Sequence, residues 1–123
     1  MQLLSQVLIG LVALIQVYIL WLDMFAWTTR GPKTFRSLRP ELFAPTKVLA
    51  ANQGLYNGFL AAGLLWALLI TDPDWHRNVA CFFLGCVAVA GVYGALTAGP
   101  RILLVQTVPA LLALAALQLT SWA

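Results

Sequence analysis

The chain contains four apolar runs, each long enough to cross a lipid bilayer as a helix. They cover residues 3–27, 48–70, 79–97 and 102–122 of a chain of 123 residues. A spanning helix needs about 20 mostly apolar residues at a rise of about 1.5 Å each. Hydrophobic residues make up 62 % of the chain and charged residues 9 %, whereas a soluble domain has about 45–50 % and about 25 %. The pattern excludes a soluble globular domain and predicts an all-α membrane protein.

The segments between the runs are short and rich in turn-forming residues. The first contains Gly31-Pro32, Pro40 and Pro45, the second is Thr71-Asp72-Pro73-Asp74, and the third is Gly99-Pro100-Arg101. Either Asp72 or Thr71 can cap the helix that follows. Because no soluble domain fits in such connections, we expect a single domain over residues 1–123. Its four transmembrane helices form an antiparallel up-down bundle, with the third and fourth as neighbours.

Basic residues lie on one side of this predicted bundle. The net charge is +3, and six of the seven basic residues fall in or beside the first and third connections: Arg30, Lys33, Arg36, Arg39, Lys47 and Arg101. Only Arg77 lies on the other side. Cytoplasmic loops carry an excess of Lys and Arg, so both termini are expected outside the cell. This topology explains the basic residues without a nucleic-acid partner, and the N-terminus does not resemble a signal peptide.

Polar side chains within the runs gather in the predicted cytoplasmic half. Such groups are costly in lipid unless they find partners. Together with two basic residues at the same level, they form the predicted ligand-binding set: Gln16, Asp23, Lys47, Asn52, Gln53, Tyr56, Asn57, Tyr93, Arg101 and Gln106. Asp23 is the only acid within a run. It can form a salt bridge to Lys47 or Arg101, or it can accept a proton or anchor a ligand.

The second run combines polar side chains with a small-residue motif. Gly54 and Gly58 form a G-x-x-x-G face that lets two helices approach closely. Polar residues flank this face on two adjacent sides of the helix, at positions 52 and 56 and at 53 and 57. Hydrogen bonds between helices and a ligand site account for them equally well. In the fourth run, Pro109 predicts a kink that frees a carbonyl near Thr107.

Metal and nucleophile motifs are weak or absent. His76 lies beside Asp72 and Asp74, but one His with two loop acids is a poor metal signal. The sequence has no Gly-rich phosphate loop, no nucleophile triad and no Cys/His metal spacing. We therefore predict no metal site, and the residues indicate no catalytic group and no cofactor.

Two segments resemble a known bacterial family. Residues 18–29 (YILWLDMFAWTT) and 46–63 (TKVLAANQGLYNGFLAAG) closely resemble the membrane family called domain of unknown function 1304, and the similarity extends over essentially the whole chain. The resemblance implies an integral protein of the bacterial inner membrane with an unassigned function. Members of that family usually carry His and Glu in helix one, where this chain has Gln16 and Asp23. An acid is thus retained, but the His is not.

The run from Lys47 to Gln53 is also distantly similar to the second helix of the MAPEG membrane proteins. These are homotrimers that handle glutathione and lipophilic substrates, or bind lipids without catalysis. Their glutathione-binding Arg, Asn and Glu fall on Ala50, Gly54 and Asn57, so these residues do not match. The similarity therefore supports a MAPEG-like architecture and oligomeric state more strongly than it supports glutathione as a cofactor.

Three functions fit the sequence. The first is binding or transport of a small amphiphile whose polar head lies among the predicted set. A chain this short forms a thin bundle, so we expect the cavity to lie between the protomers of a homodimer or homotrimer. We also expect the G-x-x-x-G face to supply close packing there, and membrane lipids to surround the assembly. The second is an accessory protein whose polar residues only join helices. The third is a MAPEG-like enzyme in which Tyr93 or Arg101 activates a thiol.

Overall fold

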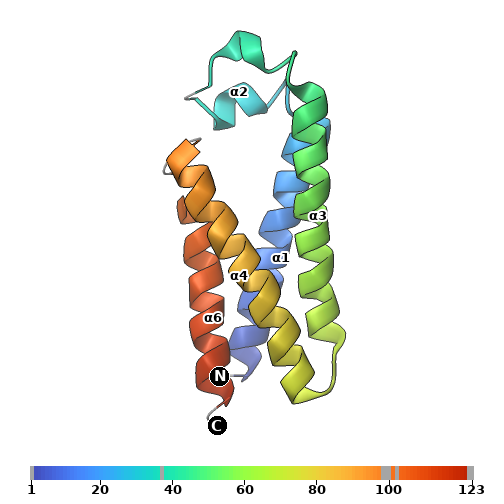
Figure 1. Ribbon diagram of the computed structural model, residues 1–123, viewed down its shortest axis with the longest axis vertical. Coiled ribbons are helices and arrows are strands. Elements are labelled where there is room, and N and C mark those ends of the chain that lie inside the picture. Colours follow the sequence, from blue (N-terminus) through green and yellow to red (C-terminus); the bar gives the residue numbers. More distant parts are fainter. Residues whose placement is uncertain (1, 37, 98–100, 102, 122–123) are drawn as a thin grey trace.

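The computed structural model describes residues 2–36, 38–97, 101 and 103–121, and these contain helices and no β-strand. Long helices run along a common axis (Figure 1): α1 (Gln2–Phe25), α3 (Lys47–Leu69), α4 (Pro73–Thr97) and α6 (Val108–Ser121). Shorter helical segments are α2 (Gly31–Thr34) and η1 (Pro40–Leu42) in the first connection, and the π-helical η2 (Leu103–Thr107) before α6. The chain is therefore all-helical, as predicted.

The arrangement brings the start of α1 and the end of α6 to one end of the molecule, while α2 and η1 lie at the other end (Figure 1). Helix α1 packs against α3 and α6, and α4 packs against α3, η2 and α6. Helices α3 and α4 are close together near the connection between them and lie further apart towards α2 (Figure 1).

Two helix boundaries differ from the predicted runs. Helix α4 begins at Pro73 rather than at residue 79, because Asp72 caps it: the Asp74 amide donates to Asp72 Oδ1 at 3.1 Å, and Pro is favoured in the first helical turn. The fourth run is not a uniform α-helix, since η2 is π-helical and ends two residues before Pro109. The predicted turn at Gly99-Pro100 lies outside the described residues.

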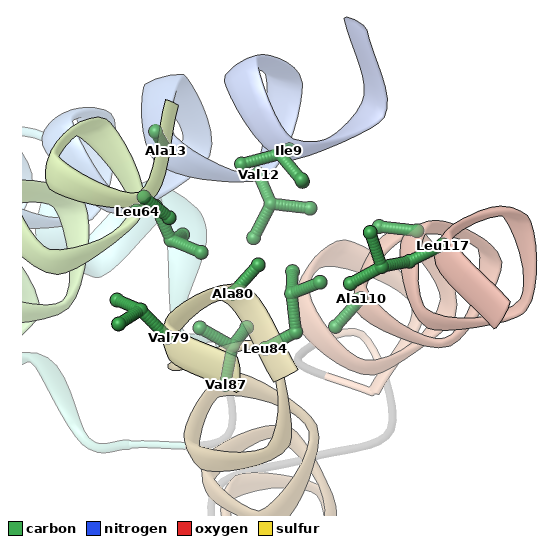
Figure 2. Close-up of a cluster of buried hydrophobic side chains, with 12 residues drawn as sticks. Ile9, Val12, Ala13, Leu64, Val79, Ala80, Leu84, Val87, Ala110 and Leu117 are labelled. Carbon is green, nitrogen blue, oxygen red and sulfur yellow. The ribbon is translucent and has the colours of Figure 1, made fainter. Parts of the chain in front are cut away.

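The apolar core lies between α1, α3, α4 and α6, in the half of the molecule away from α2 (Figures 1 and 2). Residues Ile9, Val12, Leu64 and Leu84 are at most 1 % exposed. The cluster also contains alanines at positions 13, 67, 80, 110 and 113, together with Val79, Val87 and Leu117. Small side chains at a helix interface let the backbones approach closely, which is the usual solution where helices pack in lipid.

The outer surface is also apolar. Leu3, Leu69 and Leu96, which lie in different helices, are 72 %, 80 % and 81 % exposed. Helices α1 and α4 are long and apolar enough to cross a membrane, and only 28 % and 33 % of their apolar windows are buried. A core helix of a soluble protein would be mostly buried, and a large exposed apolar surface marks contact with lipid or another protein.

Candidate functional site

A cavity of about 870 Å³ opens between α3 and α4, at the end of the molecule that carries α2. Its wall includes residues of α1, α3, α4 and η2, together with the first connection. We call it the α3–α4 cavity. Six residues of the predicted ligand-binding set line it: Asp23, Gln53, Tyr56, Asn57, Tyr93 and Gln106. The volume lies within the range of about 300–1,000 Å³ typical of small-molecule sites.

Asp23 lies in the wall that α1 contributes, and it is only 5 % exposed. Gly54 of α3 packs directly against this part of α1: a Cβ added to Gly54 would lie 2.9 Å from the Cβ of Asp23 and 3.1 Å from the Leu20 carbonyl oxygen. The G-x-x-x-G face thus joins α1 to α3 within one chain. We expected this face to pack between protomers, but Leu20 and Met24 of the same chain cover it.

The carboxylate of Asp23 has no charged partner in the described part of the chain. The ion pair found there is Arg39–Glu41 at 2.8 Å, in the first connection. The side chains of Lys47 and Arg101 are exposed and lie outside the wall of the cavity. The salt bridge considered from the sequence is therefore not formed, because both candidate cations point to the surface while Asp23 is enclosed.

Five residues of α3 line the cavity, namely Phe59 and a group of four on one side of the helix: Gln53, Tyr56, Asn57 and Leu60. Their spacing of three, four and seven residues is that of one helix face. The Asn57 amide nitrogen donates to the Gln53 carbonyl oxygen at 3.0 Å, within the same helix. The amide oxygen of Asn57 remains as an acceptor beside the cavity.

Gln106 is held in the wall by the π-helical segment η2. It is 7 % exposed, and its side-chain oxygen Oε1 has no hydrogen-bond partner among the described residues. Next to it, the hydroxyl of Thr107 donates to the Ala88 carbonyl oxygen at 3.0 Å and fastens η2 to α4. π-Helical turns are rare and often occur at functional sites.

Gly91 makes this contact between α4 and η2 possible. A Cβ at Gly91 would overlap the hydroxyl of Thr107 and would lie 2.9 Å from its amide nitrogen. The approach of the two backbones therefore depends on the absence of a side chain at this position. The sequence contained this signal only as an isolated glycine in an apolar run.

The first connection covers the end of the cavity through an aromatic cluster. The Trp27 ring lies 4.8 Å from the Phe43 ring and 5.5 Å from the Phe35 ring, centroid to centroid. The Trp27 indole N–H donates to the Thr46 hydroxyl at 3.0 Å, and that hydroxyl donates to the Leu42 carbonyl oxygen at 2.7 Å. Phe43 is 1 % exposed. The connection is thus a packed structure that presents Trp27, Phe35 and Leu38 to the cavity.

Four residues of the predicted set lie outside the wall of the cavity. Lys47, Asn52 and Arg101 are exposed. Asn52 precedes Gln53 by one residue, and this turns its side chain by about 100° around the helix. Gln16 is completely buried, and neither its Nε2 nor its Oε1 has a partner among the described residues.

Sequence reasoning missed three of the five aromatic residues in the wall. Trp27, Phe35 and Phe59 line the cavity, although none belonged to the predicted set. Phe59 follows Tyr56 by three residues, and the two rings lie 5.8 Å apart in an edge-to-face arrangement. That spacing was a usable signal, since residues three apart are neighbours on a helix surface. The positions of Trp27 and Phe35 depend on the fold of the connection, which no periodic pattern predicts.

A second cavity of about 520 Å³ lies at the opposite end of the molecule. Its polar wall includes Asp74, His76 and Arg77. Two of these groups are engaged with the protein: the His76 ring contacts the Ala67 carbonyl oxygen at 2.6 Å, and Arg77 donates to the Gln118 amide oxygen at 2.9 Å. The α3–α4 cavity is therefore the stronger candidate site.

Comparison with known proteins assigns a family without a known activity. The profile of the family described as "Protein of unknown function (DUF1304)" matches residues 10–118, a range that includes the whole wall of the α3–α4 cavity. The uncharacterized protein YpaA of Lactococcus lactis is 32 % identical over 116 residues, which cover 93 % of this chain and 96 % of the relative. No solved structure matches the chain. The extent of both matches shows that the chain belongs to the DUF1304 family.

Proposed function

We propose that the protein is a multi-pass protein of the bacterial inner membrane whose four helical segments all span the bilayer. Helix α3 has 23 residues, and its length of about 34 Å is enough for a hydrocarbon layer of about 30 Å. Its amides at Asn52, Gln53 and Asn57 make it less apolar than α1 and α4. Basic residues in the first connection support a cytoplasmic position for α2 and η1, with both termini outside.

Within this frame, we propose that the protein binds or transports a small amphiphile in the α3–α4 cavity. The observation that carries the proposal is a pair of polar groups in its wall: Gln106, whose buried Oε1 has no hydrogen-bond partner among the described residues, and Asp23, which is 5 % exposed and forms no ion pair with them. Polar groups removed from water are costly unless they form hydrogen bonds. A ligand head group can supply those partners.

The shape of the cavity also suits an amphiphile. Tyr56, Phe59, Tyr93 and Leu96 are part of its wall and are also more than half exposed. In a bilayer these residues would face lipid, so the cavity would open sideways between α3 and α4. A ligand with an apolar tail can then enter from the membrane and place its head group against Asp23.

The accessory function considered from the sequence requires the polar residues to join helices. The hydrogen bond of Thr107 joins η2 to α4, but the hydrogen bond of the Asn57 side chain stays within α3.

The MAPEG-like function requires cationic partners for the carboxylates of glutathione. The wall of the cavity contains no Lys, Arg or His among its described residues, and Arg101 lies outside it. Ligand binding therefore accounts for more of the wall than either alternative.

A bulky side chain in the wall provides the test. Ala90→Phe adds an aromatic ring in the α3–α4 cavity, whereas Ala62→Phe adds the same ring to the exposed face of α3. Small molecules that co-purify in a mild detergent would be measured by mass spectrometry. We expect a co-purified amphiphile with the wild type and with Ala62→Phe, and little with Ala90→Phe. Equal amounts with all three proteins, or none with the wild type, would contradict the proposal.

Self-association is a separate proposal. The α3–α4 cavity is lined by residues of a single chain, and a cavity between the protomers of a homodimer or homotrimer stays a prediction. A dimer or trimer would therefore use another apolar surface than the Gly54–Gly58 face. Native mass spectrometry of the solubilised protein would report the number of chains directly.

A further inference from the structure

We infer that the ligand of the α3–α4 cavity is an organic cation with an apolar body, bound through its positive charge to Asp23. This inference rests on the proposed function, because it names the class of ligand that the same cavity would take. Three features of the wall support it: its charge, its aromatic rings and its hydrogen-bonding groups.

The wall contains one acidic group and no basic group among its described residues. Asp23 is the only charged residue among the described residues of the wall, and it forms no ion pair with the described part of the chain. A carboxyl group in surroundings poor in water keeps its negative charge only beside a partner of opposite charge or several hydrogen bonds, and otherwise it binds a proton. Since the protein supplies no cation here, a positively charged ligand would complete the pair, whereas an anion would meet a like charge.

Aromatic rings line the same cavity as Asp23. Five of the residues that line the cavity are aromatic: Trp27, Phe35, Tyr56, Phe59 and Tyr93. The face of an aromatic ring carries partial negative charge and attracts cations, and this is how proteins recognise quaternary ammonium groups. The rings come from α3, α4 and the first connection, so they reach the cavity from several sides.

The amide groups add hydrogen-bond acceptors to the wall. Gln106 Oε1 is enclosed and has no partner among the described residues. The amide nitrogen of Asn57 is already used within α3, which leaves its oxygen for a ligand. A protonated amine donates hydrogen bonds and accepts none, so it matches acceptors of this kind. Ile19, Leu38 and Leu60 provide apolar surface for the rest of the molecule.

Aryl probes of similar size that differ in charge test the inference. Tetraphenylphosphonium, tetraphenylborate and neutral triphenylphosphine oxide would be titrated by calorimetry into the full-length protein in maltoside micelles, with empty micelles as the reference. We expect the wild type to bind the phosphonium at least about tenfold more tightly than either other probe. The borate would bring a second negative charge to Asp23, and the neutral probe would bring no positive charge to pair with it.

Substitutions connect this preference to Asp23. Asp23→Asn should weaken phosphonium binding at least about tenfold, and Asp23→Glu should retain it because the charge remains. Asp74→Asn makes the same chemical change at an exposed position at the other end of the molecule, and it should bind as the wild type does. If Asp23→Asn does not yield folded protein, the charge preference of the wild type still decides the question.

The outcomes separate the two proposals. Equal binding of the cation and the neutral probe, preference for the borate, or an unchanged affinity in Asp23→Asn would overturn the cation inference while leaving amphiphile binding intact. The absence of specific heat with all three probes would contradict both. Loss of affinity in Asp74→Asn equal to that in Asp23→Asn would show a general charge effect and would also overturn the inference.

Discussion

At the scale of single residues, two glycines decide how closely the helices approach around the α3–α4 cavity. Gly54 allows α3 to lie against Asp23 and Leu20 of α1, and Gly91 allows η2 to lie against α4. Both contacts hold elements that carry the enclosed polar groups of the wall. The positions of Asp23 and Gln106 therefore depend on residues that have no side chain of their own.

We predict that Gly91→Ala destabilises the protein by about 1–3 kcal/mol, because the added methyl group would overlap the Thr107 hydroxyl in a packed interface. The matched control is Gly85→Ala on the same helix, where nothing lies within 4 Å of the added Cβ. Alanine favours a helix over glycine by about 0.5–1 kcal/mol, so the control should be slightly stabilised. Chemical denaturation of the solubilised proteins would measure both. A Gly91→Ala protein as stable as the wild type would show that the α4–η2 contact is not tight.

Gly54→Ala provides a second test at this scale. The new Cβ would lie 2.7 Å from Met24 Cγ and close to the α1 backbone, so we expect α1 and α3 to move apart at a cost of about 1–3 kcal/mol. Gly10→Ala is the control in α1, since its Cβ would meet nothing within 4 Å. The movement would also shift Asp23, and phosphonium binding should weaken together with the midpoint of unfolding. An unchanged midpoint and affinity would contradict the account of this interface.

At the scale of elements, the apolar runs predicted the helices well but did not predict the structure of the connections. The runs expected at 3–27 and 48–70 correspond closely to α1 and α3, because about 20 apolar residues between turn-forming residues leave little alternative to a helix. The early start of α4 required knowledge that Asp72 acts as its cap. The π-helical turn in η2 was not predictable as such, since Pro109 signals an irregularity without specifying its form.

The candidate site was also predicted only in part. Asp23, Gln53 and Gln106 were identified because polar groups inside apolar runs are costly and therefore informative. Helix periodicity alone did not decide which side of α3 faces the cavity, so Asn52 was included although it is exposed. The contribution of Trp27 and Phe35 depends on tertiary contacts in the first connection, which are invisible to local pattern. Ligand binding by the six residues that the cavity brings together stays a prediction.

The first connection allows a prediction at the same scale. Thr46→Ala removes the partner of the Trp27 indole N–H, and an unsatisfied buried donor costs about 1–3 kcal/mol. The connection should open more often, and trypsin should cut at its exposed basic residues about fivefold faster or more. Thr28→Ala, at an exposed position nearby, should be cut at the rate of the wild type. Equal rates for both variants would contradict the account of the connection as a packed structure.

At the scale of the whole molecule, the account proposes an apolar helical body with a basic connection at one end and the cavity beneath it. The exposed leucines of α1, α3 and α4 leave a surface that only lipid or another protein can cover. The basic side chains near α2 suit the anionic surface of the cytoplasmic leaflet. The cavity would then lie in the inner half of the bilayer.

The orientation predicts a pattern of chemical labelling. In a background without the native thiols of Cys81 and Cys86, Asp74→Cys would place a thiol outside the cell, and Lys33→Cys would place one inside. A maleimide that cannot cross membranes should label the first variant in intact spheroplasts, and the second only after lysis. The reverse pattern would show that the protein is oriented the other way.

The central claim is that the α3–α4 cavity holds an amphiphile against Asp23 and Gln106, and an experimental density map of the protein in lipid nanodiscs tests it most directly. The account predicts elongated non-protein density between α3 and α4, with its polar end at hydrogen-bond distance from the Asp23 carboxylate and Gln106 Oε1. A map in which the wall has closed, with Asp23 paired to Lys47 or Arg101 and no density between the helices, would contradict it.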